Sequence, residues 1–598
     1  MTAVRRLLII VCVLAATMSS AQTTKTPRPR NLRPAPTATP QTPAPESAPT
    51  TVTTNPAEGQ VPMSDQAATA PVAADTDKDV SDPRALRLSL DEAVKTTMER
   101  NVGIQVQRYT TEMGGESLRS QYGVFDWFGT GALSHSSSET PPSSSLESSA
   151  SRQTIWDFGV QQLIPTGGTY RLSFNNDRTA TSGGFQIRNP TYHSNLGLSL
   201  NQPLLRNFGT DVTLRGVTIA RNTLGIDREL FRSTLINTAN DVEQAYLNLI
   251  YSRQYVDVVK ESVFLARDQA RITQIRIDVG ASAPLDILQP RVQIATQEEA
   301  LINAVAAVRS AEDALRALLH LDPADWDRPI IPTDTVGYTP VDIDATQAVA
   351  RALDLRPEIR ELQLTTATRS VQYKYARNQT LPQVDLSLLY RTAGLGGQAL
   401  SVDPFTGQPT NLPSTTYSNA LRQVGLGTFP TWTIGFTLGV PITNIGARAE
   451  AKRAELDLAQ SKTDEEQTRQ NIVVQVRSTV RLIDTAAKDI SATRAARDAA
   501  EKNLDAERKR YENGMTTNFQ VLQIQQQLSD ARVRELNALV GYNKAVTAYH
   551  AAVGDLLDVR NIKVEEEKVE EPHFPFFSTL DRYNWLKYDK ANRSEEKK

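Results

Sequence analysis

The sequence predicts an α+β membrane protein in which about six β-strands per chain cross the membrane and long α-helices follow them. Segments of about ten residues alternate apolar and polar side chains, as strands do. Much longer segments repeat apolar residues every three or four positions, as amphipathic helices do. Both halves of the chain also follow one order: a helix, strands, a long helix and a shorter helix. That order predicts two tandem structural repeats.

Composition excludes several classes of protein. The chain has 598 residues with 65 Lys and Arg against 68 Asp and Glu, a net charge of −3 that gives no reason to expect a nucleic-acid partner. Cys12 is the one cysteine, and the five histidines lack metal-ligand spacing. Neither a catalytic constellation nor a cofactor motif is found, so we expect no enzyme, no cofactor and no metal site.

The chain begins with a basic stretch to Arg6, an apolar run over residues 7–16 and the small residues Ser19, Ser20 and Ala21. This is the pattern of a secretory signal peptide, and the alternative is a buried helix. The next segment is rich in Pro, Thr and Ala without aromatics, which predicts a disordered linker. The expected divisions are a signal peptide at 1–21, a linker at 22–83, a first repeat at 86–321, a second repeat at 340–557 and a charged, aromatic tail at 558–598.

Internal duplication is visible at residue level, since Arg276 and Gly280 recur 234 positions later as Arg510 and Gly514. Both glycines follow the long helices, where a left-handed cap is favoured. The two longest helices would each extend about 100 Å. The apolar periodicity predicts helices over residues 89–122, 211–278, 287–319, 345–378, 446–512 and 519–555.

The alternating segments have one apolar, aromatic face and one small, polar face, typical of transmembrane barrel strands. Four such segments lie in the first half and two in the second. Long polar segments at 139–150, 180–193 and 393–428 are expected to be loops at one end of the strands. The residues expected to face lipid are Trp156, Phe158, Tyr170, Phe174, Trp432 and Phe436.

Six strands are too few to enclose a pore, because single-chain barrels begin at eight strands. Open sheet edges cannot face lipid, since their backbone groups would lack hydrogen-bond partners. Several chains must therefore share one barrel if these strands lie in a membrane. The alternative is a soluble antiparallel sheet with one buried face.

Paired motifs in both halves resemble the TolC-like outer membrane efflux protein family. Over residues 86–557 the chain carries Leu90-Asp91-Glu92-Ala93-Val94, then Arg276-Ile277-Asp278-Val279-Gly280, and Arg510-Tyr511-Glu512-Asn513-Gly514 in the second half. Each motif alone is weak, but two copies in the same order are specific. The resemblance implies a homotrimer in the outer membrane, with a helical barrel in the periplasm that docks a membrane-fusion adaptor and an inner-membrane pump. Such a channel-tunnel is a passive exit duct for small molecules or proteins.

Family members contribute four strands per chain, so six strands predict 18 per trimer instead of 12. The alternative is that residues 139–193 form a decorated loop or a plug hairpin. Two other functions remain open on the residues alone: a periplasmic coiled-coil interaction protein, which would not need the strands, and a substrate-selective porin, which would not need the long helices.

The resemblance also assigns a periplasmic gate. Asp286 matches an acidic position on the first helical hairpin and Tyr511 its partner on the second, whereas Gln520 and Gln523 occupy two positions that are usually acidic. Carboxylate rings favour cations, so these glutamines predict weaker cation selectivity. The alternative is that both are ordinary solvated helix residues. Gly280 and Gly514 are candidate tips for adaptor docking, a role compatible with simple helix capping.

Overall fold

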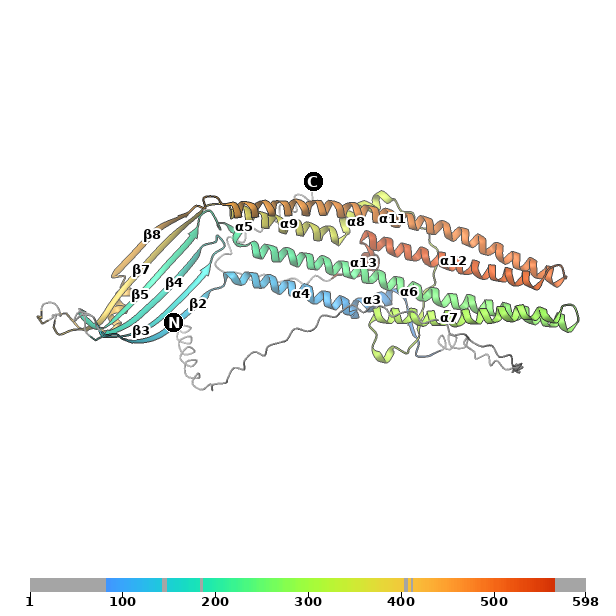
Figure 1. Cartoon of the computed structure of the whole chain (residues 1–598), viewed down its shortest axis with the longest axis horizontal. Coiled ribbons are helices and arrows are strands. Elements are labelled where there is room, and N and C mark those ends of the chain that lie inside the picture. Colours follow the sequence, from blue (N-terminus) through green and yellow to red (C-terminus); the bar gives the residue numbers. More distant parts are fainter. Residues whose placement is uncertain (1–81, 142–147, 183–185, 403–406, 410–411, 565–598) are drawn as a thin grey trace, which may run out of the picture. The chain divides into compact units, whose positions relative to one another are not determined.

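The computed structural model describes residues 82–141, 148–182, 186–402, 407–409 and 412–564. The expected signal peptide and nearly all of the expected linker lie outside these ranges, as does the tail beyond residue 564. The described part consists of one large antiparallel sheet, a bundle of long helices and a small two-stranded parallel sheet of β1 (Leu86–Leu88) and β6 (Ile330–Pro332) (Figure 1).

The large sheet has six strands, as the alternating segments predict. Its order is β2-β3-β4-β5-β7-β8, with each neighbouring pair antiparallel. Since β3 and β4 lie between β2 and β5 in continuous register, the alternative of a plug hairpin at 139–193 is wrong. The strands are β2 (Phe128–Glu139), β3 (Ala150–Leu163), β4 (Thr169–Thr181), β5 (Arg188–Pro203), β7 (Gln383–Ala399) and β8 (Phe429–Gly439).

The helices agree with the predicted segments, except that three expected helices are each divided. The expected helix at 211–278 is interrupted at Leu214, between α5 and α6. Asn101 separates α3 from α4 because its side chain accepts hydrogen bonds from the first backbone N–H groups of α4. Pro357 begins α9 and ends the helical path of α8. The helices are α3 (Leu90–Arg100), α4 (Val102–Tyr122), α5 (Thr210–Thr213), α6 (Arg215–Asp278), α7 (Leu288–Leu319), α8 (Ala345–Leu355), α9 (Pro357–Asn378), α10 (Tyr417–Leu426), α11 (Ile445–Glu512), α12 (Asn518–Val553) and α13 (Leu556–Val559).

The long helices pack side by side. Helix α6 contacts α4 on one side and α9 on the other, and α9 in turn contacts α11 (Figure 1). Helices α6 and α7 form one hairpin, and α11 and α12 form a second that packs against the first through α12 and α6. With 64 and 68 residues, α6 and α11 each extend about 100 Å, which accords with the expected length.

The largest core lies where α6 packs against α3, α7 and α13. Tyr246 and Leu249 of α6 and Leu315 of α7 are fully buried there. Burial raises the pKa of Tyr246, whose hydroxyl donates to the carbonyl oxygen of Leu88 and to Asp334. The phenol therefore stays neutral and ties α6 to the strand that precedes α3.

A fully buried carboxylate links three elements of the same core. Glu312 of α7 accepts hydrogen bonds from Arg253 of α6 at 2.7 Å, from Arg316 at 3.1 Å and from the backbone N–H of Ile330 at 3.2 Å. Arg309 adds an ion pair at 3.3 Å. Such a group is tolerated in a core only because its charge is paired and its oxygens are hydrogen-bonded.

Three boundaries differ from expectation. Of the loop expected at 180–193, residues 180–181 belong to β4 and residues 188–193 belong to β5. Residues 393–428 do not form one loop: β7 continues to Ala399, and residues 417–426 form helix α10, which packs on β7 and β5. The folded part also extends past the expected boundary at 557. Arg560 donates to the buried carboxylate of Glu243 at 2.6 Å and pairs with Asp91 at 3.1 Å, so this part of the expected tail belongs to the core.

Candidate functional site

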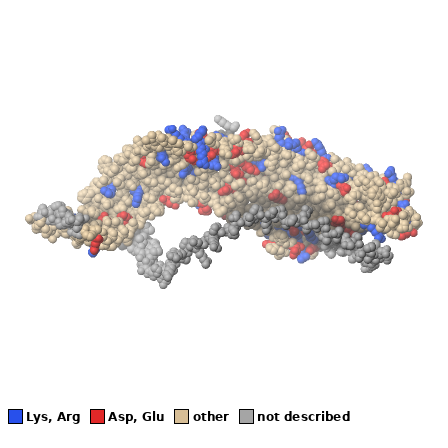
Figure 2. All heavy atoms as spheres, viewed as in Figure 1, with Lys and Arg blue, Asp and Glu red and all other residues tan. Residues whose placement is uncertain are grey.

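The sheet presents an exposed apolar face. Its register places the six expected aromatics on the same side: Phe158 is opposite Phe174, Gln162 opposite Tyr170, and β7 aligns Trp432 and Phe436 with them. Phe158, Trp432 and Phe436 are 54%, 72% and 70% exposed, so no described segment covers them. In the view of Figure 2, charged side chains lie mainly over the helices, whereas the sheet carries few. A surface of this kind suits a hydrocarbon environment.

Trp156 differs from the other five aromatics. Its indole Nε1 donates to the hydroxyl of Tyr417 at 3.3 Å, and the two rings meet edge to face with centroids 5.4 Å apart. Tyr417 belongs to α10, so this helix covers the end of the apolar face that lies farthest from α6 and α11. The opposite face of the sheet carries polar side chains, including Asp157, Arg171 and Asn175.

The ends of the two helical hairpins have matching geometry. Gly280 and Gly514 have φ values of +78° and +70°, a left-handed conformation that glycine adopts without strain. The backbone N–H of Ala281 donates to the carbonyl oxygen of Arg276 at 2.7 Å, and that of Met515 donates to the carbonyl oxygen of Arg510 at 2.9 Å. Several large apolar side chains around these turns are exposed, namely Val279, Leu285, Val292, Met515 and Phe519.

A buried polar cluster joins the two hairpins near these ends. The side chain of Asn518, on α12, accepts from Gln269 at 2.7 Å and from Thr273 at 3.3 Å, both on α6. The hydroxyl of Tyr511, on α11, lies 3.4 Å from that of Thr273, and Tyr511 itself is only 5% exposed. Arg276 stacks its guanidinium on the Tyr511 ring at 4.6 Å and donates to the Tyr511 carbonyl oxygen.

The predicted gate residues are only partly brought together. Asp286 does not reach the Tyr511 side chain: its carboxylate accepts from the N–H of Ala283 at 3.1 Å and so caps the start of its own helical turn. The connection runs through Asn518, whose side chain donates to the backbone oxygen of Asp286 at 3.5 Å. Gln520 and Gln523 are exposed on α12.

Sequence reasoning missed Gln269, Thr273 and Asn518. A signal was present for the first two, because they continue the three-and-four spacing of Val259, Val263 and Ala266 in α6. Polar residues at core positions of an apolar stripe require partners of their own. The partner Asn518 comes from a helix 245 positions away from Thr273, and local pattern cannot identify it.

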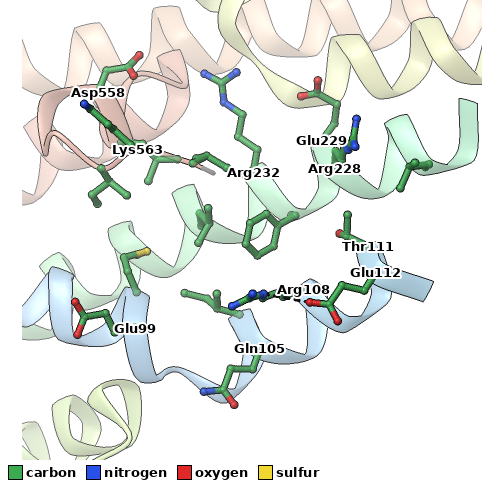
Figure 3. A pocket seen from close by; sticks show the side chains of 18 residues that line it. Glu99, Gln105, Arg108, Thr111, Glu112, Arg228, Glu229, Arg232, Asp558 and Lys563 are labelled. Atoms are coloured by element: carbon green, nitrogen blue, oxygen red, sulfur yellow. Dashed lines mark ion pairs between the residues drawn. The ribbon is translucent and has the colours of Figure 1, made fainter. Parts of the chain in front are cut away.

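A groove of about 990 Å³ lies between α3, α4, α6, α13 and the residues that follow α13 (Figure 3). Its floor is apolar, with Met98, Phe231 and Leu557, and its rim alternates in charge. Arg108 and Glu112 pair along α4 at 3.3 Å. Mixed charges paired in this way suit protein packing better than the binding of a charged small molecule.

Within the described ranges, no cluster of three His, Cys, Asp or Glu side chains is arranged to hold a metal ion. Across the same residues, no helix combines the length and the apolar character needed to span a bilayer.

Comparison with known proteins identifies the class. The family described as outer membrane efflux protein matches residues 167–320 and 348–555. The outer membrane efflux protein BepC of Brucella suis biovar 1 (strain 1330) is 23% identical over 378 residues, covering 63% of this chain and 75% of BepC. The structure of the Campylobacter jejuni outer membrane channel CmeC superposes with a TM-score of 0.55 at 16% identity, covering 80% of this chain and 87% of that one. The structure of the Vibrio cholerae outer membrane protein VceC superposes with a TM-score of 0.55 at 13% identity, covering 78% of this chain and 96% of that one.

An antiparallel sheet with an exposed apolar face, followed by paired helical hairpins, thus has the fold of outer-membrane channel proteins. The chain belongs to the outer membrane efflux protein family, and it is an outer-membrane efflux channel.

Proposed function

We propose that three copies of the chain close one 18-stranded barrel and that the duct continues through a helical barrel in the periplasm. The two edge strands carry this proposal. Over the described residues, β2 pairs only with β3 and β8 only with β7, and the two edges have 12 and 11 residues. Unpaired backbone N–H and C=O groups of an edge strand cannot face lipid. They gain hydrogen-bond partners when β8 of one copy pairs with β2 of the next, which the matched lengths allow.

The two halves of the chain act as tandem repeats in this arrangement. Helices α4, α6, α9 and α11, which pack side by side, supply the wall of the periplasmic tunnel. The polar face of the sheet lines the pore, and the apolar face with Phe158, Trp432 and Phe436 contacts outer-membrane lipid. The proposed duct is passive: the chain provides a water-filled path.

The hairpin ends take two roles in the proposal. The turns at Gly280 and Gly514, with their exposed apolar neighbours, dock a periplasmic membrane-fusion adaptor that connects to an inner-membrane pump. The cluster around Tyr511 holds the hairpins together as the periplasmic gate. Asp286 supplies an exposed carboxylate to the opening. Because Gln520 and Gln523 are neutral, the opening carries less negative charge than it would with carboxylates at those two positions.

Edge-strand crosslinking tests the shared barrel. Cys12 lies in the expected signal peptide, so the expected mature chain has no cysteine. Leu133→Cys on β2 is combined in turn with Trp432→Cys, Ile434→Cys and Phe436→Cys on the same face of β8. Oxidation is expected to yield crosslinked oligomers up to a trimer for at least one combination. Leu133→Cys with Thr433→Cys, on the opposite face, is the control, and monomers in every combination would contradict the shared barrel.

Export itself is tested by deletion. Cells that lack the protein should accumulate compounds that wild-type cells expel, and the intact gene should restore their efflux. Unchanged efflux together with reduced uptake of a solute would instead favour a substrate-selective porin.

A further inference from the structure

We propose that α10 is a collar helix at the outer boundary of the membrane, with Leu421 and Leu426 in contact with lipid acyl chains and Arg422 at the level of the headgroups. This inference rests on the proposed lipid contact of the apolar face of the sheet, and it adds a helix to the part of the chain that contacts the membrane.

Helix α10 packs directly on the outer end of β7. A Cβ atom at Gly394 would collide with the carbonyl oxygen of Ala420, and one at Gly396 with that of Thr416. The hydroxyl of Thr392 donates to the carbonyl oxygen of Val424 at 3.2 Å. From Thr416 to Val424, the helix therefore follows the strand from Gly396 back to Thr392.

The face that α10 covers is the apolar one. The register aligns Trp156 with Asn176, Asn176 with Ser194 and Ser194 with Gly394, so all four lie on the same side as Phe158. Tyr417 reaches across from α10, and its hydroxyl donates to the side-chain oxygen of Asn176 at 2.9 Å. Asn176 and Ser194 are both buried. The Ser194 hydroxyl donates to the side-chain oxygen of Asn176. Contact of such polar groups with hydrocarbon would be costly, and α10 shields this pair by covering it.

The height of α10 along the sheet follows from β8. Eleven residues at about 3.3 Å each, tilted by about 45°, cover roughly 26 Å, which is close to the roughly 25 Å apolar band of outer-membrane barrels. Strand β8 begins at Phe429, opposite Ala393 of β7. Because α10 packs on residues 392–396, it lies at the end of the band where hydrocarbon gives way to headgroups.

The side chains of α10 suit this depth. Ala420 and Val424 are buried against the strands, whereas Leu421 and Leu426 are 37% and 74% exposed on the outside. Arg422 and Ser418 are also exposed. A short helix with one packed side and an outer side of leucines and one arginine has the amphipathic character of interfacial segments.

Fluorescent labelling of single cysteines in the full-length protein, reconstituted in phosphatidylcholine vesicles, tests the collar. An environment-sensitive nitrobenzoxadiazole probe is attached at Leu426→Cys, at Ile434→Cys in the middle of β8, and at Ser418→Cys near the start of α10. Lipids carrying a nitroxide quencher either near the headgroup or deep in the acyl chain report depth. We expect quenching at Leu426 that is stronger for the shallow quencher, quenching at Ile434 that is stronger for the deep one, and little quenching at Ser418.

The outcomes separate the collar from the lipid face. If Ile434 is quenched while Leu426 stays in water, the apolar face contacts lipid but α10 projects beyond the membrane, and the collar is overturned. If neither position is quenched, the sheet itself does not lie in the bilayer, and the proposed lipid contact fails with it. Trimer migration of each labelled variant on a native gel confirms that the label has not disrupted assembly.

Discussion

The guanidinium of Arg276 on α6 lies 4.6 Å from the ring centroid of Tyr511 on α11, and it also donates to the carbonyl oxygen of that tyrosine. One side chain therefore contacts both the ring and the backbone of the other hairpin near its end. Thr273, on the same helix as Arg276, contacts both the Tyr511 hydroxyl and the Asn518 side chain, so side chains of α6 join the second hairpin here.

Replacing Arg276 with alanine is expected to loosen this joint. The stacked pair contributes about 0.5–2 kcal/mol, so its loss shifts the hairpins toward separation. Arg276→Ala should raise the single-channel conductance or the open fraction in planar bilayers. Arg271→Ala, which removes an exposed partner of Asp268 on the same helix, is the matched control. Equal conductance in both variants would show that the Tyr511 contact does not hold the gate.

Adding carboxylates at Gln520 and Gln523 is expected to increase cation selectivity, because a ring of negative charge raises the local cation concentration. The double variant Gln520→Asp, Gln523→Asp should shift the reversal potential under a salt gradient toward the cation potential. The neutral variant Gln520→Asn, Gln523→Asn has side chains of the same size as the aspartate variant, and it should leave the reversal potential unchanged. If the aspartate variant also leaves it unchanged, the two residues are solvated helix positions without a role in the pore.

Neutralising Glu312 is expected to destabilise the core between α6 and α7. Glu312→Gln leaves the buried guanidinium of Arg253 without an ion pair and Arg316 with Asp313 alone, at a cost of about 3 kcal/mol in the free energy of unfolding. Glu116→Gln, which removes an exposed pair with Arg119, should cost less than about 0.5 kcal/mol. Thermal unfolding followed by circular dichroism compares them, and similar midpoints would contradict the structural role of Glu312.

Adding a methyl group at Gly394 is expected to displace α10, since the new Cβ would collide with the Ala420 carbonyl oxygen. Gly394→Ala should make the peptide bond after Arg422 more susceptible to trypsin in detergent micelles. Gly129→Ala is the control, because a Cβ there meets no atom within 4 Å on the same face of the sheet. Identical digestion of the two variants would mean that the helix accommodates the methyl group.

Periodicity predicted most of the fold, because it reports the burial of one face and needs no knowledge of distant contacts. The alternation through Trp432 and Phe436 identified β8, and the spacing of apolar residues identified α6 and α11. Helix α10 was missed because Ala420 and Val424 are its only buried residues, too few apolar positions for a visible helical stripe.

The site was less predictable for a similar reason. Capping at Gly280 and Gly514 is local and was expected from their positions after long helices. The Asn518 contacts depend on how the two hairpins pack against each other. The carboxylate of Asp286 accepts a hydrogen bond from the N–H of Ala283 and does not contact the other hairpin through its side chain. Both depend on side-chain geometry that spacing along the chain does not determine.

In the proposed channel, several copies of this six-stranded chain share one barrel. Native mass spectrometry of the protein, extracted from the membrane fraction in mild detergent, tests it most directly. We expect a trimer of the mature chain that requires detergent to remain in solution. A monomer that stays in solution without detergent would contradict the shared barrel, because its apolar sheet face and both edge strands would then be stable in water.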